Sequence, residues 1–537
     1  MLYILSEKKI EKFLLFCIFI GILLHIIPYF YHRSLWIDEA MLVSSICTRS
    51  FSTLIATPLD WGQSSPIGWL FIVKLLTSLF GTSVTVLRMW SLISCIISMF
   101  LIYLILKGKV KDNYALLITA IFMITNMFIY YGNEAKPYMS DNMFCLLTLF
   151  IWQKYKENKI SLWICCLFYS FILWFSFISI FFIASCMLIE LVGLSIESVK
   201  RKNISFYKYL SLSLVLISFI ANYYVWISKS AGNAGGAEYW ANLKFPLIPK
   251  SLSDIKLSIL LIRQLVGFYP LPIAFLFICL NVYYIFNVTK TLKDQSGIIL
   301  PFIVSLILLF VASSLGYYPI QDRLVQIYSI LCIIIVGFSL DDLYENKIIS
   351  NNIFSIKLKI IIYYFVLAFC LAIIGMIGCK NLFPRHIYIK GEEISKSYNY
   401  LKHNIINRDV IYVDSYSIPV FTYINSYQTK FSDLESSEKK DPEFKLNLPQ
   451  KIGNIIYGQP LFSFYNKAPF SYDGENNKKA ANEDAVLIAQ NPSVYIFTSH
   501  GEAGIDYLLS LLKSNGKIET VVDYYDTHLY HYQKYVK

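Results

Sequence analysis

The sequence has little charge for its length. Only 15% of its 537 residues are Asp, Glu, Lys or Arg, whereas 56% are hydrophobic and the mean hydropathy is +0.53. A soluble domain rarely has this balance, so the composition indicates an integral membrane protein. The net charge of +11 is spread over loops and forms no basic arm. Nucleic acid is therefore not an expected partner, and the basic residues are better interpreted as topology signals.

Several motifs are also absent. No cysteine follows Cys379, so the last part of the chain cannot contain a disulfide. The chain has no internal repeat and no G-x-G-x-x-G or P-loop motif, which leaves a nucleotide unsupported as a direct substrate. No small-residue cleavage site follows the first apolar run at 13–30, so this run is predicted to be a retained helix.

Long apolar runs dominate the first two thirds of the chain. Eleven of them are long enough, or nearly so, to cross a bilayer. They lie at about 13–30, 84–106, 114–131, 137–153, 161–176, 177–194, 206–227, 258–286, 298–315, 324–340 and 358–379. The continuous stretch 161–194 is too long for one span, and we expect it to turn near Phe175.

One further apolar segment, 66–80, is too short for a span. As a helix it covers about 22 Å, less than the roughly 30 Å of a hydrocarbon core. If it does not cross, every Lys/Arg-rich connector lies in the cytoplasm, where such loops are expected. We therefore predict about eleven spans plus a short re-entrant or interfacial helix, with a cytoplasmic N-terminus. Segments 31–65, 228–257 and 316–323, and the Glu134 turn, then lie outside with the C-terminal region.

The C-terminal region has a different pattern. Short apolar runs at 410–413 and 494–497 are typical of buried strands, and 507–512 is helical with Gly516 as the expected C-cap. Alternating strands and helices predict a small extracytoplasmic α/β domain. We divide the chain into a transmembrane domain, 1–383, and this domain, 384–537. Its position suggests a role in recognising the acceptor.

The most informative short segment follows the first apolar run. Asp38 and Glu39 are adjacent carboxylates at the point where the chain leaves the membrane. A carboxylate at that depth is costly unless it is paired, hydrated or used in chemistry. The segment thus favours an enzyme that acts on a lipid-borne substrate, with a carboxylate as general base. The alternative for Asp38 is an N-cap or a surface charge.

Two later turns carry further polar residues. Glu134, Lys136, Tyr138 and Asp141 gather at one span junction, where they could hold a sugar or a phosphate. Interfacial anchoring is the alternative for Lys136 and Tyr138. Arg323 begins a span on the outer side, where positive charge is not expected, and arginine binds phosphate oxygens bidentately. The alternative is that its neighbour Asp322 simply neutralises it.

These residues together resemble the polytopic GT-C glycosyltransferases, over roughly residues 10–380. The resemblance rests on Trp-x-Asp-Glu-Ala at 36–40, Gln-x-x-Pro at 63–66, Glu-x-Lys-Pro-Tyr at 134–138 and Tyr-Pro-x-x-x-Arg at 318–323. The bacterial relatives of protein O-mannosyltransferases and the aminoarabinose transferases are the most similar groups. Members transfer a sugar from a polyprenyl-phosphate carrier to an acceptor outside the membrane.

The resemblance implies roles for particular residues. Asp38 corresponds to the catalytic base of the family, Glu134 to a second acidic residue near the active site and Arg323 to a phosphate contact. Glu39 is a further candidate catalytic acid. Many relatives have His or Lys before the Pro of the short helix, where this chain has Ser64-Ser65, so Arg33 or Lys74 is expected to replace that phosphate contact. The expected substrate-binding residues are Arg33, Gln63, Lys74, Lys136, Tyr138, Asp141, Tyr318 and Arg323.

The function predicted is an inverting hexosyl- or pentosyltransferase of the bacterial cytoplasmic membrane. Its partners would be membrane lipids, a polyprenyl-phosphate sugar and an envelope acceptor that is a glycolipid, a polysaccharide or a protein. No cofactor is required, although Asp38 and Glu134 could hold a divalent metal through oxygen ligands. A transporter or flippase for a lipid-linked glycan is the main alternative, and a non-catalytic membrane subunit is another. Transporters usually show paired repeats and charged sites at the midplane, which this sequence lacks.

Overall fold

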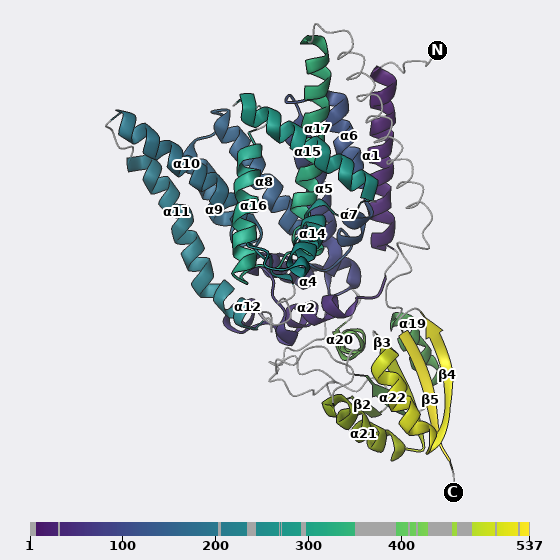
Figure 1. The fold of residues 1–537 in the computed structure, drawn as a ribbon. Helices are drawn as coiled ribbons and strands as arrows, with labels where there is room; N and C mark the ends of the chain where they lie inside the picture. The colour runs from purple at the N-terminus through teal and green to yellow at the C-terminus, as the bar shows by residue number, and fades with distance from the viewer. Residues whose placement is uncertain are drawn as a thin grey trace.

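The computed structural model consists of a large helical block and a smaller α/β domain beyond one end of it (Figure 1). It describes residues 7–30, 33–201, 206–233, 243–267, 269, 271–291, 297–349, 394–405, 409–414, 417–427, 454–458, 475–499, 502–524 and 527–535. The expected span at 358–379 and the expected domain boundary at 383/384 lie outside these residues.

Long apolar helices form the block. They are α1 Glu7–Phe30, α5 Val84–Leu106, α6 Asp112–Ile124, α7 Asn126–Tyr131, α8 Tyr138–Lys156, α9 Leu162–Ile172, α10 Ser179–Arg201, α11 Phe206–Asn222, α15 Leu271–Thr291, α16 Ile299–Ser314 and α17 Gln326–Ile349. In the described part of the chain, five helices are long and apolar enough to cross a membrane, within α1, α5, α10, α11 with its continuation, and α17. The chain is therefore a multi-pass membrane protein. The count of eleven spans stays a prediction.

Shorter helices cover the end of the block that faces the α/β domain. They are α2 Ile37–Thr48, α3 Phe51–Ala56, η1 Asp60–Gly62, α4 Ile67–Phe80, η2 Tyr223–Ile227, α12 Ser228–Asn233, α14 Leu252–Val266 and η4 Asp322–Leu324. α4 is the short apolar helix expected at 66–80, and its 14 residues span about 21 Å. Whether it enters the membrane stays a prediction.

The helices pack closely where a small residue allows it. α1 crosses α6 at Gly21, where an added Cβ would lie 2.5 Å from the Cβ of Met123. Large apolar side chains such as Phe13, Phe16 and Phe19 point outward from the same helix and are about half exposed. Small residues between helices and apolar residues around them are the pattern of a membrane helix bundle.

The span predicted at 258–286 is divided in two. The apolar run at 258–286 forms the end of α14 and most of α15, with a break at Gly267. Gly267 has φ +89°, and a Cβ there would lie 2.5 Å from Ser329 Oγ, so only glycine fits this turn. A continuous helix over 258–286 was therefore the wrong expectation, because an apolar run does not reveal where packing against a distant residue such as Ser329 ends a helix.

The α/β domain has a five-stranded sheet in the order β2-β1-β3-β5-β4. The strands are β1 Val410–Val413, β2 Asn454–Tyr457, β3 Ser493–Ser499, β4 Gly516–Tyr524 and β5 Thr527–Lys534, and the helices are α19 Ile394–Asn404, α20 Ile418–Thr422, η6 Tyr423–Tyr427, α21 Glu475–Ala489 and α22 Glu502–Lys513. β2, β1 and β3 run parallel, and β5 and β4 are antiparallel to their neighbours. Gly516, expected to cap a helix, is instead the first residue of β4.

Candidate active site

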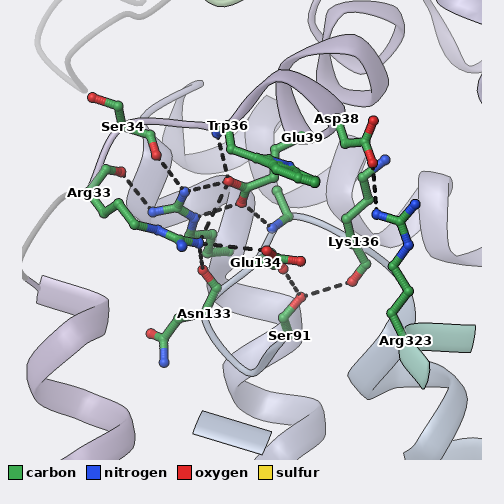
Figure 2. Close-up of polar contacts among 12 residues, drawn as sticks. Arg33, Ser34, Trp36, Asp38, Glu39, Ser91, Asn133, Glu134, Lys136 and Arg323 are labelled. Atoms are coloured by element: carbon green, nitrogen blue, oxygen red, sulfur yellow. Dashed lines mark hydrogen bonds and ion pairs between the residues drawn. The ribbon is translucent and has the colours of Figure 1, made fainter. Parts of the chain in front are cut away.

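Four segments meet where the helical block faces the α/β domain. They are the loop from Arg33 into α2, the first turns of α5, the turn between α7 and α8, and η4 (Figure 2). Their charged side chains form two groups. We call Arg33, Glu39, Arg88 and Glu134 the closed cluster. We call Asp38, Lys136 and Arg323 the open cluster, together with the neutral Gln63, which directly follows η1.

The closed cluster is built around Glu39, which is 0% exposed. Its Oε1 accepts hydrogen bonds from Arg88 Nε at 2.9 Å and from the backbone N–H of Ala135 at 2.7 Å. Its Oε2 accepts from Arg88 Nη2 at 2.7 Å and from the N–H of Trp36 at 3.0 Å. Burial alone would raise the pKa of Glu39, but Arg88 and Arg33 hold it below its ordinary value. Glu39 is thus a fully bonded carboxylate.

Arg88 is the residue that sequence reasoning missed. It lies in the second turn of α5, is 3% exposed, and also donates to the carbonyl oxygens of Arg33 at 2.8 Å and Ser34 at 3.0 Å. It therefore ties the loop before α2 to a membrane helix. The signal was present in the sequence, because a lone arginine inside an apolar run requires a buried partner.

Glu134 completes the closed cluster from the turn between α7 and α8. Its carboxylate is 3.9 Å from Arg33 Nη2, and the Arg33 guanidinium lies over the ring of Tyr130. Ser91 Oγ donates to the carbonyl oxygens of Glu134 and Lys136, which fixes the turn. Burial, reinforced by the nearby Glu39 and opposed by Arg33, raises the pKa of Glu134 to about 7.

The open cluster contains Asp38, the neighbour of Glu39 in sequence. Its side chain is 28% exposed, and Oδ2 forms an ion pair with Arg323 Nη1 at 2.9 Å. The side chain of Arg323 is 15% exposed, and its Nε donates to Gln321. The guanidinium also lies 6.0 Å from the ring of Trp36. Residues 285 positions apart thus meet at a site that solvent can reach.

Lys136 is the second cation of the open cluster. Its Nζ donates to Gln63 Oε1 at 2.8 Å, and the ammonium group points toward Asp38 in Figure 2. Burial lowers the pKa of Lys136, and the carboxylate of Asp38 opposes that shift. The structure therefore places Asp38, Gln63, Lys136 and Arg323 near one another. Their role in binding substrate stays a prediction.

Beneath the open cluster, the first turn of α8 meets the start of α17. Asn142 Nδ2 donates to Gln326 Oε1 at 2.8 Å. Gln326 lies three residues after Arg323 in the sequence. Among the described residues, Asp141 Oδ1 and Gln326 Nε2 are buried atoms that have no hydrogen-bond partner. Buried polar atoms are nearly always bonded, so such atoms require an explanation.

Tyr138 and Tyr318 lie in the same region. Tyr138 is buried against Tyr131, and the hydroxyl of Tyr318 donates to the carbonyl of Leu324 at 3.3 Å. Tyr318 also packs edge-on against Phe181. Tyr318 thus lies against η4, and Tyr138 lies at the first residue of α8.

Lys74, expected near the phosphate, lies elsewhere. Its Nζ donates at 2.8 Å to the carbonyl of Ile46, in the last turn of α2. A cation at a helix C-terminus satisfies an open carbonyl and interacts favourably with the helix dipole. The structure thus places Lys74 at the opposite end of α2 from Asp38.

Asp38 and Glu134, considered as ligands for a divalent metal, belong to different clusters. Asp38 pairs with Arg323, and Glu134 lies beside Arg33. Within the described residues, no three His, Cys, Asp or Glu side chains come together in a way that could hold a metal ion.

Comparison with known proteins identifies the fold. No protein-family model matches the sequence, and no curated protein matches it either. The crystal structure of ArnT from Cupriavidus metallidurans with bound undecaprenyl phosphate aligns over 98% of this chain and 98% of its own, with TM-score 0.52 and 10% identity. The apo ArnT structure aligns over 95% and 97%, with TM-score 0.50 and 10% identity.

A third structure aligns less well. The oligosaccharyltransferase AglB from Archaeoglobus fulgidus, in complex with an inhibitory peptide and a dolichol-phosphate, covers 99% of this chain and 75% of its own, with TM-score 0.47 and 11% identity. The two ArnT structures alone carry the assignment. The chain has the GT-C fold, as the sequence resemblance implied.

Proposed function

We propose that this protein is an inverting glycosyltransferase that moves a sugar from a polyprenyl-phosphate carrier to an envelope acceptor on the outer face of the bacterial cytoplasmic membrane. The fold of ArnT, one structure of which holds undecaprenyl phosphate, supports the carrier. The observation that carries the proposal is the open cluster, in which a partly exposed carboxylate stands beside two cations at the membrane boundary.

The two cations suit the phosphate of the carrier. Arg323 presents a planar fork of N–H donors that matches phosphate oxygens, and Lys136 adds a compact charge beside it. Burial lowers the pKa of Lys136, so the arriving phosphodiester anion of the donor stabilises its charged form. Charge that develops on the leaving phosphate during transfer is thus met by groups already in position.

Asp38 is the proposed general base. A single displacement at the anomeric carbon requires one base to deprotonate the acceptor and no second carboxylate as nucleophile, so the reaction should invert that centre. Asp38 and the phosphate would both bind Arg323, and the ion pair at 2.9 Å is the arrangement of the protein alone. Donor binding would draw Arg323 toward the phosphate and release Asp38 to accept a proton.

The unbonded atoms below the open cluster suit the sugar. Asp141 Oδ1 can accept a hydrogen bond, and Gln326 Nε2 can donate one. Asp141 lies three residues after Tyr138, and Gln326 lies three residues after Arg323. A sugar hydroxyl both donates and accepts, so it could satisfy these atoms. Whether the sugar is a hexose or a pentose depends on contacts of this kind.

The remaining acids have supporting roles in this proposal. Glu39 has no free lone pair directed at a substrate, because four donors occupy its oxygens. Glu134 holds Arg33 and the turn that carries Lys136. The outward orientation rests on the Lys/Arg-rich connectors, which lie on the opposite side of the predicted spans from the site.

The test follows radiolabel in membranes that contain polyprenyl-phosphate sugars. Wild type should consume one donor, and Asp38→Asn should bind it but turn it over about 100- to 10,000-fold more slowly. Asp60→Asn is the matched control, because Asp60 is a partly exposed aspartate of the same end of the block that pairs with Arg49 outside the open cluster. It should retain turnover.

Two outcomes would contradict the proposal. Equal turnover by Asp38→Asn and wild type would exclude Asp38 as the base. If no carrier sugar is consumed while a lipid-linked glycan changes leaflet, the protein is a flippase.

A further inference from the structure

The α/β domain and the helical block share one hydrophobic core. α20 and η6 pack on α2, the helix whose first turn contains Asp38 and Glu39, and Figure 1 shows α20 next to α2. Buried residues of this core come from both parts of the chain and include Leu42, Val43, Ile46, Val420, Phe421 and Tyr423. Deletion of residues 384–537 would uncover this apolar surface, so the role of the domain has to be tested with point variants.

Tyr423 makes the most direct connection. It is 1% exposed, and its hydroxyl donates at 2.7 Å to the carbonyl oxygen of Thr82. The next residue, Ser83, caps the N-terminus of α5 by accepting from the N–H of Val86. Arg88 follows within two turns of the same helix. Tyr423 therefore contacts the start of α5, the helix whose Arg88 bonds to Glu39.

The environment of Tyr423 confirms how near this contact is to the closed cluster. Burial raises the pKa of Tyr423 well above its ordinary value, and the charges of Arg88 and Glu39 act on it from nearby. Its hydroxyl therefore remains a donor at any working pH. The bond to Thr82 is a constant link between the two domains.

A second link joins the loop before α2. Ser34 Oγ donates to Ser395 Oγ at 2.8 Å and accepts from the backbone N–H of Ser395 at 3.1 Å, in the first turn of α19. The carbonyl oxygen of Ser34 accepts from Arg88. Arg88 is therefore held between two contacts with the α/β domain, one through Thr82 and one through Ser34.

We infer that the α/β domain is part of the catalytic unit and that Tyr423 is a positioning residue for the transfer reaction. Tyr423 fixes the start of α5, Arg88 then fixes Glu39 and the loop, and this sets the place of Asp38 at the start of α2. The inference rests on the proposed function, and it adds a residue that touches neither donor nor acceptor. Displacement of a reacting group by about 1 Å can slow a reaction about 100-fold.

Tyr423→Phe in the full-length protein tests the inference, because it removes only the hydroxyl. We expect unchanged binding of the polyprenyl-phosphate sugar and a kcat about tenfold lower, because a shift of the loop by less than about 1 Å should cost less than about 100-fold. Tyr398→Phe is the matched control. Tyr398 is also buried, and its hydroxyl donates at 2.9 Å to Asn425 inside the same domain. Among the residues that the structure describes, none in the helical block bonds to this hydroxyl.

The comparison separates positioning from stability. Both variants should lose a similar amount of thermal stability, but only Tyr423→Phe should lower kcat per folded molecule. Amide hydrogen exchange of residues 83–90 should also be faster in Tyr423→Phe than in Tyr398→Phe. If both variants show the same kcat and the same exchange in this segment, the inference is overturned.

Failure of the proposed function would be recognised separately. If wild type consumes no carrier sugar, the glycosyltransferase proposal fails, and hydrogen exchange still decides whether Tyr423 holds α5 and the loop before α2. If wild type is active, Asp38→Asn loses turnover and Tyr423→Phe matches Tyr398→Phe, only the positioning role is excluded.

Discussion

Asp38 and Glu39 are adjacent acids in very different surroundings. Glu39 is fully buried, and four hydrogen bonds join it to a loop, a helix and a turn. Asp38 is 28% exposed and has one ion pair, with Arg323. Adjacent residues on a helix point about 100° apart. One turn of α2 can therefore hold a fully bonded, buried carboxylate on one side and a partly exposed carboxylate on the other.

The largest change in stability is expected when Arg88 is replaced. Arg88→Met leaves the buried Glu39 with only the longer ion pair to Arg33, at 3.8 Å, which should destabilise the protein by about 3 kcal/mol. Glu39→Gln should have a similar effect, because it leaves Arg88 unpaired. Asp38→Asn should hardly change the melting temperature in the same detergent. Equal losses in all three variants would show that the two clusters do not differ as described.

Glu134 gives a pH test of the closed cluster. Its pKa is raised from 4.5 to about 7, so between these values the folded protein holds a proton that the unfolded chain has lost. Stability should therefore fall as pH rises through this interval, by about 1.4 kcal/mol per unit at most. Glu134→Gln cannot titrate, so its advantage in melting temperature over wild type should grow from pH 5 to pH 8.

Glu519→Gln is the control for that measurement. Glu519 is an exposed carboxylate of β4 that pairs with Lys517, and its pKa is lowered. This variant should gain no advantage with rising pH. A constant difference between Glu134→Gln and wild type would contradict the raised pKa.

The open cluster can be tested by ligand competition. Arg323→Gln should weaken binding of polyprenyl phosphate about 10- to 100-fold, since a hydrogen bond to a charged group contributes about 1.5–3 kcal/mol. Asp38→Asn should bind the same lipid at least as tightly as wild type, because it releases Arg323. Weaker binding by Asp38→Asn would mean that Asp38 supports the phosphate and does not compete with it.

The smallest effect is expected at the far end of α2. Lys74→Met removes a donor to the carbonyl of Ile46 and should cost about 1 kcal/mol of stability. Turnover and polyprenyl-phosphate binding should remain at wild-type levels. A large loss of lipid binding would instead support the phosphate contact that the sequence suggested.

The sequence predicted best what depends on local composition. Val84–Leu106 is an uninterrupted apolar run, and it has the same limits in the structure. The division at Gly267 depends on packing against Ser329, which lies in a distant helix. Local patterns therefore predict where helices form better than where a tertiary contact ends them.

The site residues follow the same logic. Asp38, Lys136 and Arg323 could be selected because charged residues at span ends are unusual, and the structure brings them together. Glu39 could not be separated from Asp38 in the sequence, since the difference is made by Arg88, 49 residues later. The sequence suggested Lys74 as a phosphate ligand because it does not reveal the actual contact. Lys74 donates to the carbonyl of Ile46 on α2, a bond that forms only in the folded protein.

The contact between Ser34 and Ser395 has a consequence for biosynthesis. The two residues are 361 positions apart, so at about 5–20 residues per second a ribosome needs roughly 20–70 s to make the second after the first. During this interval the loop before α2 has been synthesised without its partner. The last step in assembling the site is thus the arrival of the C-terminal domain, and a nascent chain that stops before Ser395 contains Asp38 and Arg323 but not the link that joins them to α19.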